Sequence, residues 1–118
     1  MKLSVVVMAL VLSACSIMPQ SPAQTVYVAK IDHAAALIPA VAYKHLPACS
    51  DAVKPPCSDI AVVGQLQMAD DVADGALDAA ETAVRTPGFG KDVVRTAVAA
   101  ANAAVAALVS ITNTLRSK

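Results

Sequence analysis

The chain has 118 residues, which is the size of a single domain, and its formal net charge is zero. Such a chain has no basic field to attract phosphate backbones, and this argues against nucleic-acid binding. Hydrophobic residues make up 57% of the sequence, with alanine the most frequent among them, and aromatic residues only 3%. We therefore expect a thin core, because alanine buries little apolar area.

Residues 1–14 have the layout of an export leader. Lys2 supplies a positive charge, and residues 5–12 form an apolar run that is too short to cross a bilayer as a helix. The run leads into Leu12-Ser13-Ala14-Cys15. This sequence resembles the lipobox of bacterial lipoproteins, in which an aliphatic residue and two small residues precede a cysteine. The resemblance implies cleavage before Cys15, which would become the first residue of the mature protein.

By the same resemblance, the Cys15 thiol takes up diacylglycerol and the new amino group takes an acyl chain. No cofactor is expected besides this covalent lipid, whose several acyl chains suffice for stable anchoring. The alternative is an ordinary secretory leader cut after Ala23, where Pro22 makes a poor cleavage site. In enterobacterial lipoproteins an aspartate after the cysteine favours the inner membrane. Ser16 therefore implies an envelope protein facing the periplasm and anchored in the outer membrane rather than the inner one.

Residues 15–20 form a tether, and residues 21–118 are predicted to form an all-α domain. Ser21 and Pro22, with Gln24 three residues after the serine, are typical of a helix start, so the first helix should cover about residues 21–46. Pro39 should kink this helix or split it in two. One stripe of residues spaced by four and three is predicted to face the core: Tyr27, Ile31, Ala34, Ile38, Val41 and His45.

Two further helices are predicted over residues 58–85 and 91–116, separated by Thr-Pro-Gly-Phe-Gly at 86–90. The apolar stripe of the second is Val62, Leu66, Ala69, Ala73, Ala76 or Leu77, Ala80 and Val84. That of the third is Val94, Val98, Ala101, Val105, Leu108, Thr112 and Leu115. Short connections favour an up-down-up bundle of three helices. We expect charged residues to interrupt every long apolar run after residue 30, and hence no membrane-spanning segment there.

Two segments, residues 42–49 (Ala-Tyr-Lys-His-Leu-Pro-Ala-Cys) and 84–90 (Val-Arg-Thr-Pro-Gly-Phe-Gly), resemble a set of short, alanine-rich, uncharacterised lipoproteins of proteobacteria and their prophages. The resemblance supports the helical fold. It implies no activity, because none is attached to that group.

The remaining cysteines, Cys49 and Cys57, are predicted to form a disulfide, since lipid occupies Cys15 and the periplasm is oxidising. The alternative joins His45 to these two cysteines as metal ligands, but a fourth ligand is not evident. We therefore predict no metal site. His33 and His45 are expected at the surface or its edge. Asp70, Asp74 and Asp78 are expected on a solvated face of the second helix.

No serine lies in a nucleophile-elbow pattern and no glycine-rich loop suits a phosphate, so we predict no catalytic residues and no enzyme. The expected function is that of a lipid-anchored envelope protein with a structural or protein-interaction role. Its partners would be the membrane, through the anchor, and either an envelope protein or a second copy. Self-contacts would run through Val94, Val98, Val105 and Leu108, or through the Tyr27 and Ile31 stripe. The alternatives are a prophage-encoded envelope factor acting in lysis or exclusion, and a periplasmic carrier of a metal or another ligand.

Overall fold

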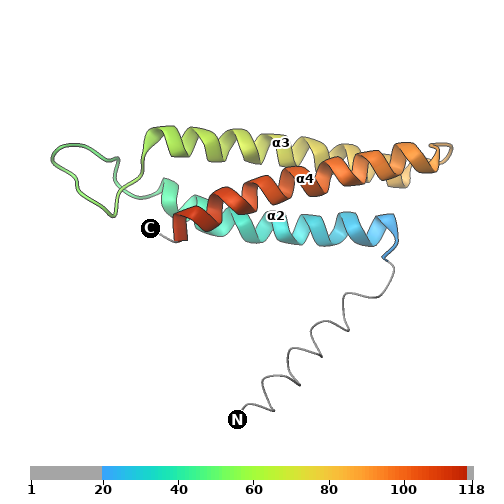
Figure 1. The fold of residues 1–118 in the computed structure, drawn as a ribbon, viewed down its shortest axis with the longest axis horizontal. Helices are drawn as coiled ribbons and strands as arrows, with labels where there is room; N and C mark the ends of the chain where they lie inside the picture. Colours follow the sequence, from blue (N-terminus) through green and yellow to red (C-terminus); the bar gives the residue numbers. More distant parts are fainter. Residues whose placement is uncertain (1–19, 117–118) are drawn as a thin grey trace, which may run out of the picture.

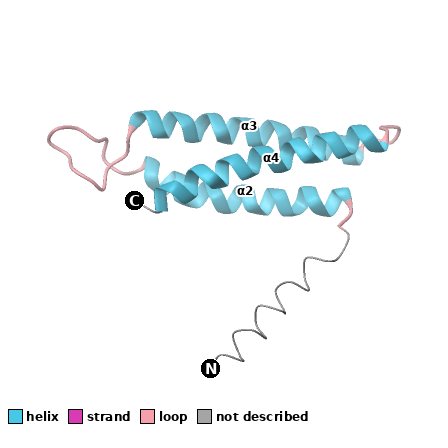
Figure 2. Cartoon of the chain, viewed as in Figure 1, coloured by secondary structure: helices cyan, strands magenta, loops and turns pink. Residues whose placement is uncertain are grey.

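The computed structural model describes residues 20–116, which form three helices and, within that range, no strand (Figures 1 and 2). The helices are α2 (Pro22–Lys44), α3 (Ile60–Arg85) and α4 (Lys91–Arg116). Figure 1 shows α2 and α4 running in one direction and α3 in the other, and each helix packs against both others. The predicted up-down-up bundle is confirmed. The predicted leader, Cys15, residues 16–19 of the tether and residues 117–118 lie outside the described residues.

α2 begins at a reciprocal cap. The Ser21 hydroxyl accepts from the Gln24 backbone N–H at 3.3 Å, and the Gln24 side chain accepts from the Ser21 N–H at 3.0 Å. The helix then continues through Pro39 to Lys44, so of the two predicted outcomes, a kink or a split, the split is wrong. Proline removes one backbone hydrogen bond. Burial of Ala36 and Ala40 on either side of it holds this stretch of the helix against the bundle.

The predicted core face of α2 is wrong. Two of its large members are among the most exposed apolar residues of the described chain, with Ile38 73% and Tyr27 66% exposed. The residues that α2 buries are instead Val26, Ala29, Ala36 and Ala40. Small side chains allow close approach of helices, and Lys30 and His33, on the inner side, have acidic partners on α3. A prediction from apolar spacing alone assigns the largest apolar residues to the core, because it takes no account of these polar pairs between helices.

The core faces of α3 and α4 are confirmed. α3 buries Leu66, Ala73, Leu77, Ala80 and Ala83, and α4 buries Val98, Ala101, Val105, Leu108 and Thr112. The core is thin, because seven of the thirteen buried hydrophobic residues in the described part are alanines. Leu77 and Leu108 are the largest side chains that are fully buried.

Residues 45–59 join α2 to α3 in a loop that is held at its base. The Ser58 N–H donates to the Pro47 carbonyl at 2.8 Å and the Cys49 N–H donates to the Ser58 carbonyl at 2.9 Å. Ser58 is buried, and its hydroxyl donates to the Leu46 carbonyl at 3.0 Å. These bonds join the two ends of the loop to each other, beside the end of α2 and the start of α3.

Candidate functional site

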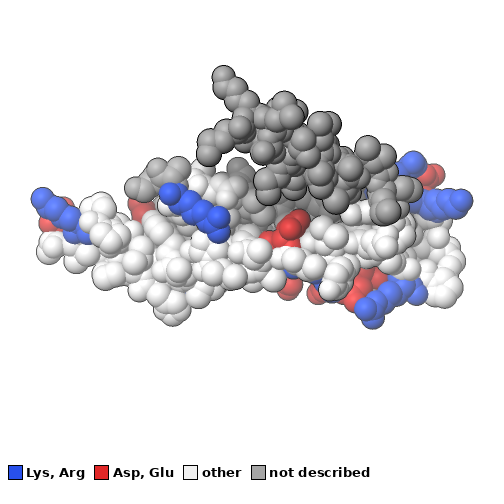
Figure 3. All heavy atoms as spheres, turned by 90° about the horizontal axis from the view of Figure 1, so that it is seen from below, with Lys and Arg blue, Asp and Glu red and all other residues white. Residues whose placement is uncertain are grey.

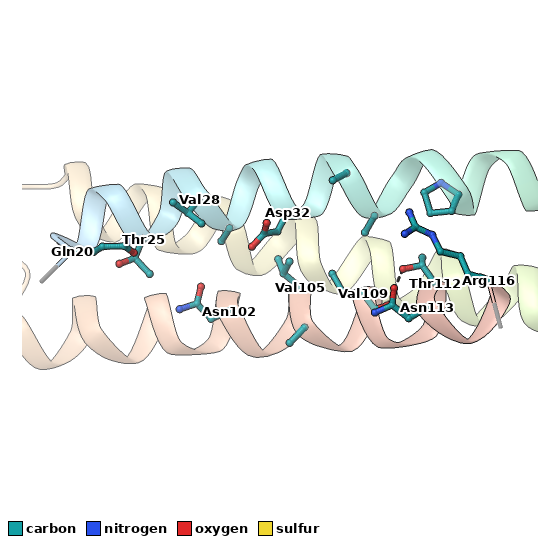
Figure 4. A pocket seen from close by; sticks show the side chains of 15 residues that line it. Gln20, Thr25, Val28, Asp32, Asn102, Val105, Val109, Thr112, Asn113 and Arg116 are labelled. Atoms are coloured by element: carbon teal, nitrogen blue, oxygen red, sulfur yellow. Dashed lines mark hydrogen bonds between the residues drawn. The ribbon is translucent and has the colours of Figure 1, made fainter. Parts of the chain in front are cut away.

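A groove of about 620 Å³ between α2 and α4 is the first feature that could receive a ligand or partner (Figure 4). Small apolar residues of both helices, including Ala29, Ala36 and Val105, line it. Figure 4 places Asp32 along its length and Arg116 towards one end. A second groove of similar volume, about 630 Å³, lies between the starts of the same two helices and includes Phe89. Both are apolar surfaces bordered by a few polar groups.

Four polar side chains of the first groove could take part in binding or catalysis: Asp32, Asn102, Asn113 and Arg116. Within residues 20–116 none of them has a hydrogen bond or ion pair to another side chain. In Figure 4 Asn113 and Arg116 share one end of the groove, and Asp32 and Asn102 lie apart from them and from each other, so the four side chains do not converge on one point. Acid–base catalysis needs titratable groups within hydrogen-bond reach of one reacting atom, and this spacing does not supply that.

A second polar feature lies between α2 and α3, where His33 Nε2 is 2.7 Å from Asp70 Oδ1. The Asp70 side chain is 37% exposed and that of His33 12% exposed, which agrees with a place at the edge of the surface; the contact between the two was not predicted. His45, Asp74 and Asp78 are exposed, as predicted.

The His33–Asp70 pair resembles half of a catalytic triad, because a histidine oriented by a carboxylate can serve a nucleophile. Residues 26–48, which include most of α2, contain no serine, threonine or cysteine, and neither do residues 60–81 of α3. The two helix segments that surround the pair therefore offer no serine, threonine or cysteine nucleophile. We interpret the pair as a structural link between the helices.

The same interface contains an ion pair between Lys30 on α2 and Glu81 on α3. Arg85 adds a second cation, 2.6 Å from the other oxygen of Glu81. The hydrogen bond from Lys30 lowers the pKa of Glu81 below its ordinary value; burial acts in the opposite direction, and the charges of Arg85 and Lys30 lower it further. Sequence reasoning missed both inter-helix pairs. The available clue was the spacing of Lys30 and His33, one turn apart on α2, together with the acidic residues of α3.

The structure joins Cys49 to Cys57 in the predicted disulfide, with the two Cα atoms 5.0 Å apart. Both sulfurs are therefore engaged, which leaves no free thiolate for the alternative metal site with His45. In residues 20–116 no group of three or more His, Cys, Asp or Glu side chains is arranged to hold a metal ion. Cys15, the predicted lipid attachment site, lies outside the described residues.

Two helices, α2 and α4, are long and apolar enough to cross a membrane by length and composition alone. This corrects the expectation that charges interrupt every later apolar run, because residues 96–115 contain none. In each helix only 22% of the most apolar stretch is buried inside the protein. The bundle therefore leaves much of the apolar surface of these two helices uncovered.

No protein-family model, curated protein or solved structure matches the chain.

Proposed function

We propose that the chain is a lipid-anchored protein of the bacterial cell envelope that faces the periplasm and has a structural or protein-interaction role without catalytic activity. The observation that carries the proposal is Leu12-Ser13-Ala14-Cys15 at the end of a short apolar run. A cysteine after two small residues suits a peptidase that needs close backbone access and a thiol that takes up lipid. The capped start of α2 at Ser21 follows only six residues later, which gives the domain a short tether.

The Cys49–Cys57 disulfide supports export. Structural disulfides form and persist in oxidising compartments and are rare in the cytosol. The chain contains three cysteines, so this pairing leaves Cys15 as the remaining thiol for the lipid.

The polar groups of the bundle support a role without catalysis. Lys30, His33, Asp70 and Glu81 are engaged in joining α2 to α3. Asp32, in the groove between α2 and α4, has no titratable partner within the described residues. The four paired groups are engaged in contacts between helices, which is a structural role.

Metabolic labelling with an alkyne-bearing fatty acid tests the anchor. The wild type should be labelled, and Cys15→Ser should lose the label and accumulate as uncleaved precursor in the inner membrane. The matched control is Cys49→Ser combined with Cys57→Ser, which changes cysteines elsewhere and should keep the label. Normal labelling of Cys15→Ser would rule out the lipoprotein assignment.

The location is tested by Ser16→Asp, which the enterobacterial sorting pattern predicts will move the protein from the outer to the inner membrane fraction. Ser16→Thr is the control and should leave the distribution unchanged. Cross-linking in intact cells, followed by affinity capture of the lipidated protein, then identifies any envelope partner.

A further inference from the structure

The outward side of α2 presents a continuous apolar surface, which we call the apolar ridge. Its members are Tyr27, Ile31, Ala34, Ile38 and Val41, spaced by four and three so that they follow one line along the helix. Tyr27 and Ile38 are 66% and 73% exposed, and Ile31 and Val41 are each 50% exposed. From residue 27 to residue 41 the ridge is about 20 Å long, at 1.5 Å per residue.

No charged residue interrupts the apolar ridge. Lys30 and His33 are paired with α3, and Asp32 lines the groove towards α4. Figure 3, which looks onto the side of the bundle where α2 lies, is largely white where the described residues are visible, with charged side chains in separate small groups. Single exposed apolar residues are ordinary, but a contiguous apolar surface of this kind indicates something that covers it.

A second copy of the chain is one predicted occupant, and the predicted self-contacts run either through four residues of α4 or through the Tyr27 and Ile31 stripe. Three of the four α4 residues, Val98, Val105 and Leu108, are buried in the bundle itself and are not available for contact with a second copy. The apolar ridge is available. Its position relative to the predicted anchor favours a different occupant, namely the membrane.

The ridge belongs to the helix nearest the predicted lipid. Cys15 and Ser21 are six residues apart, and an extended chain spans at most about 3.5 Å per residue, so the start of α2 lies within about 20 Å of the lipid attachment point. An exposed apolar surface on a helix can be buried in the membrane interface, and binding of this kind adds to that of a lipid anchor. Tyr27, at the end nearest the tether, has a ring and a hydroxyl suited to the boundary between acyl chains and headgroups.

We propose that the apolar ridge of α2 rests on the surface of the bilayer that holds the lipid anchor, with α2 lying along the membrane plane. The proposal rests on the lipid anchor proposed above. In this arrangement α2 is the membrane-facing helix, and the outward sides of α3 and α4 remain accessible from the periplasm.

The test uses tryptophan as a depth probe, because the chain has no tryptophan of its own. The Tyr27→Trp variant places the probe on the apolar ridge. The Met68→Trp variant, on α3, is the matched control, because Met68 is 71% exposed and not part of the ridge. Each full-length variant is expressed with its leader, purified as the mature lipidated protein and reconstituted into phosphatidylethanolamine–phosphatidylglycerol vesicles. Circular dichroism checks that the helical content is unchanged.

Nitroxide-labelled lipid should quench the fluorescence of the Tyr27→Trp variant several-fold more than that of the Met68→Trp variant. Aqueous iodide should quench the fluorescence of the Met68→Trp variant several-fold more than that of the Tyr27→Trp variant. Equal quenching of the two variants would overturn the proposal. Shielding of the ridge probe from iodide without quenching by the nitroxide lipid would also overturn it, because the ridge would then be covered by protein, such as a second copy.

Mass spectrometry of the purified protein separates the two proposals. If acyl groups are present and the nitroxide lipid does not quench the ridge probe, the anchor stands and the membrane-facing ridge is wrong. If acyl groups are absent, the anchor is wrong, and the same vesicles are added to the unlipidated Tyr27→Trp variant. Quenching by the nitroxide lipid would then support binding by the ridge itself, and lack of quenching would overturn it.

Discussion

His33 of α2 and Asp70 of α3 link their helices through a contact of 2.7 Å between Nε2 and Oδ1. One turn earlier on α2, Lys30 pairs with Glu81. These two links and the buried alanines lie on the side of α2 that faces the bundle. With α2 in this orientation, Ile31 and Ile38 lie on its outward side and remain 50% and 73% exposed.

The His33–Asp70 link should stabilise the fold measurably. His33→Ala and Asp70→Ala should each lower the free energy of unfolding by about 1 kcal/mol, the usual net value of a hydrogen bond. The double variant should lose less than the sum of the two single losses, because both remove the same contact. Urea denaturation measures all three, with exposed Asp74→Ala as the control. Strictly additive losses would mean that the contact contributes nothing.

Stability should fall in acid partly through Glu81. Because Lys30 lowers its pKa in the folded protein, the unfolded chain binds the proton more readily. The contribution of Glu81 to the stability of the fold is therefore complete above its ordinary pKa of 4.5. It is lost as the pH falls through the lower pKa that Glu81 has in the folded protein. The difference in unfolding free energy between wild type and Glu81→Gln should shrink as the pH falls from 7 to about 3. The control, Asp78→Asn, should give a difference that depends less on pH.

Buried and ridge residues should respond differently to truncation. Leu77 is 2% exposed, and Leu77→Ala should lower the free energy of unfolding by about 3 kcal/mol through lost burial and a cavity. Ile38 is 73% exposed, and Ile38→Ala should change it by less than about 0.5 kcal/mol in detergent-free solution of the unlipidated chain. Denaturant melts of the two variants provide the comparison. A large loss for Ile38→Ala would show that the ridge is buried in solution, as in a dimer.

The number, order and approximate bounds of the helices could be predicted from the sequence, because caps, prolines and glycines mark their ends locally. The inner faces of α3 and α4 were also predictable, since their buried leucines, valines and alanines follow a regular helical spacing. The prediction failed for α2, whose inner face consists of Val26 and three alanines with Lys30 and His33. That face becomes favourable only when Glu81 and Asp70 are brought opposite it, and such a long-range pairing is not visible in a local pattern.

The disulfide should contribute to stability by restricting the unfolded chain. Cys49 and Cys57 close a loop of nine residues, for which the chain-entropy relation gives about 2.5 kcal/mol. Cys49→Ala combined with Cys57→Ala should therefore melt earlier than the wild type. A reducing agent should lower the melting temperature of the wild type and leave that of the double variant unchanged. Two thiols that alkylate freely in native protein from the periplasm would contradict the disulfide.

The same glycine-to-alanine change should have opposite effects at two positions. Gly75 lies inside α3, and a Cβ built there meets no atom within 4 Å. Alanine is favoured over glycine in a helix interior by about 1 kcal/mol, partly because it restricts the unfolded chain. Gly88 lies in the turn between α3 and α4 with φ of 98°, a conformation that strains any residue with a Cβ.

Gly75→Ala should thus raise the free energy of unfolding by about 0.5 to 1 kcal/mol, and Gly88→Ala should lower it by about 1 kcal/mol or more. Gly64→Ala, a second open position in α3, should act in the same direction as Gly75→Ala, and the two gains should add because the sites are about three turns apart. Urea melts of the single variants and of the Gly64 and Gly75 double variant measure these effects. A loss of stability in Gly75→Ala would mean that another surface closely approaches this part of α3, since the bundle itself leaves the space open.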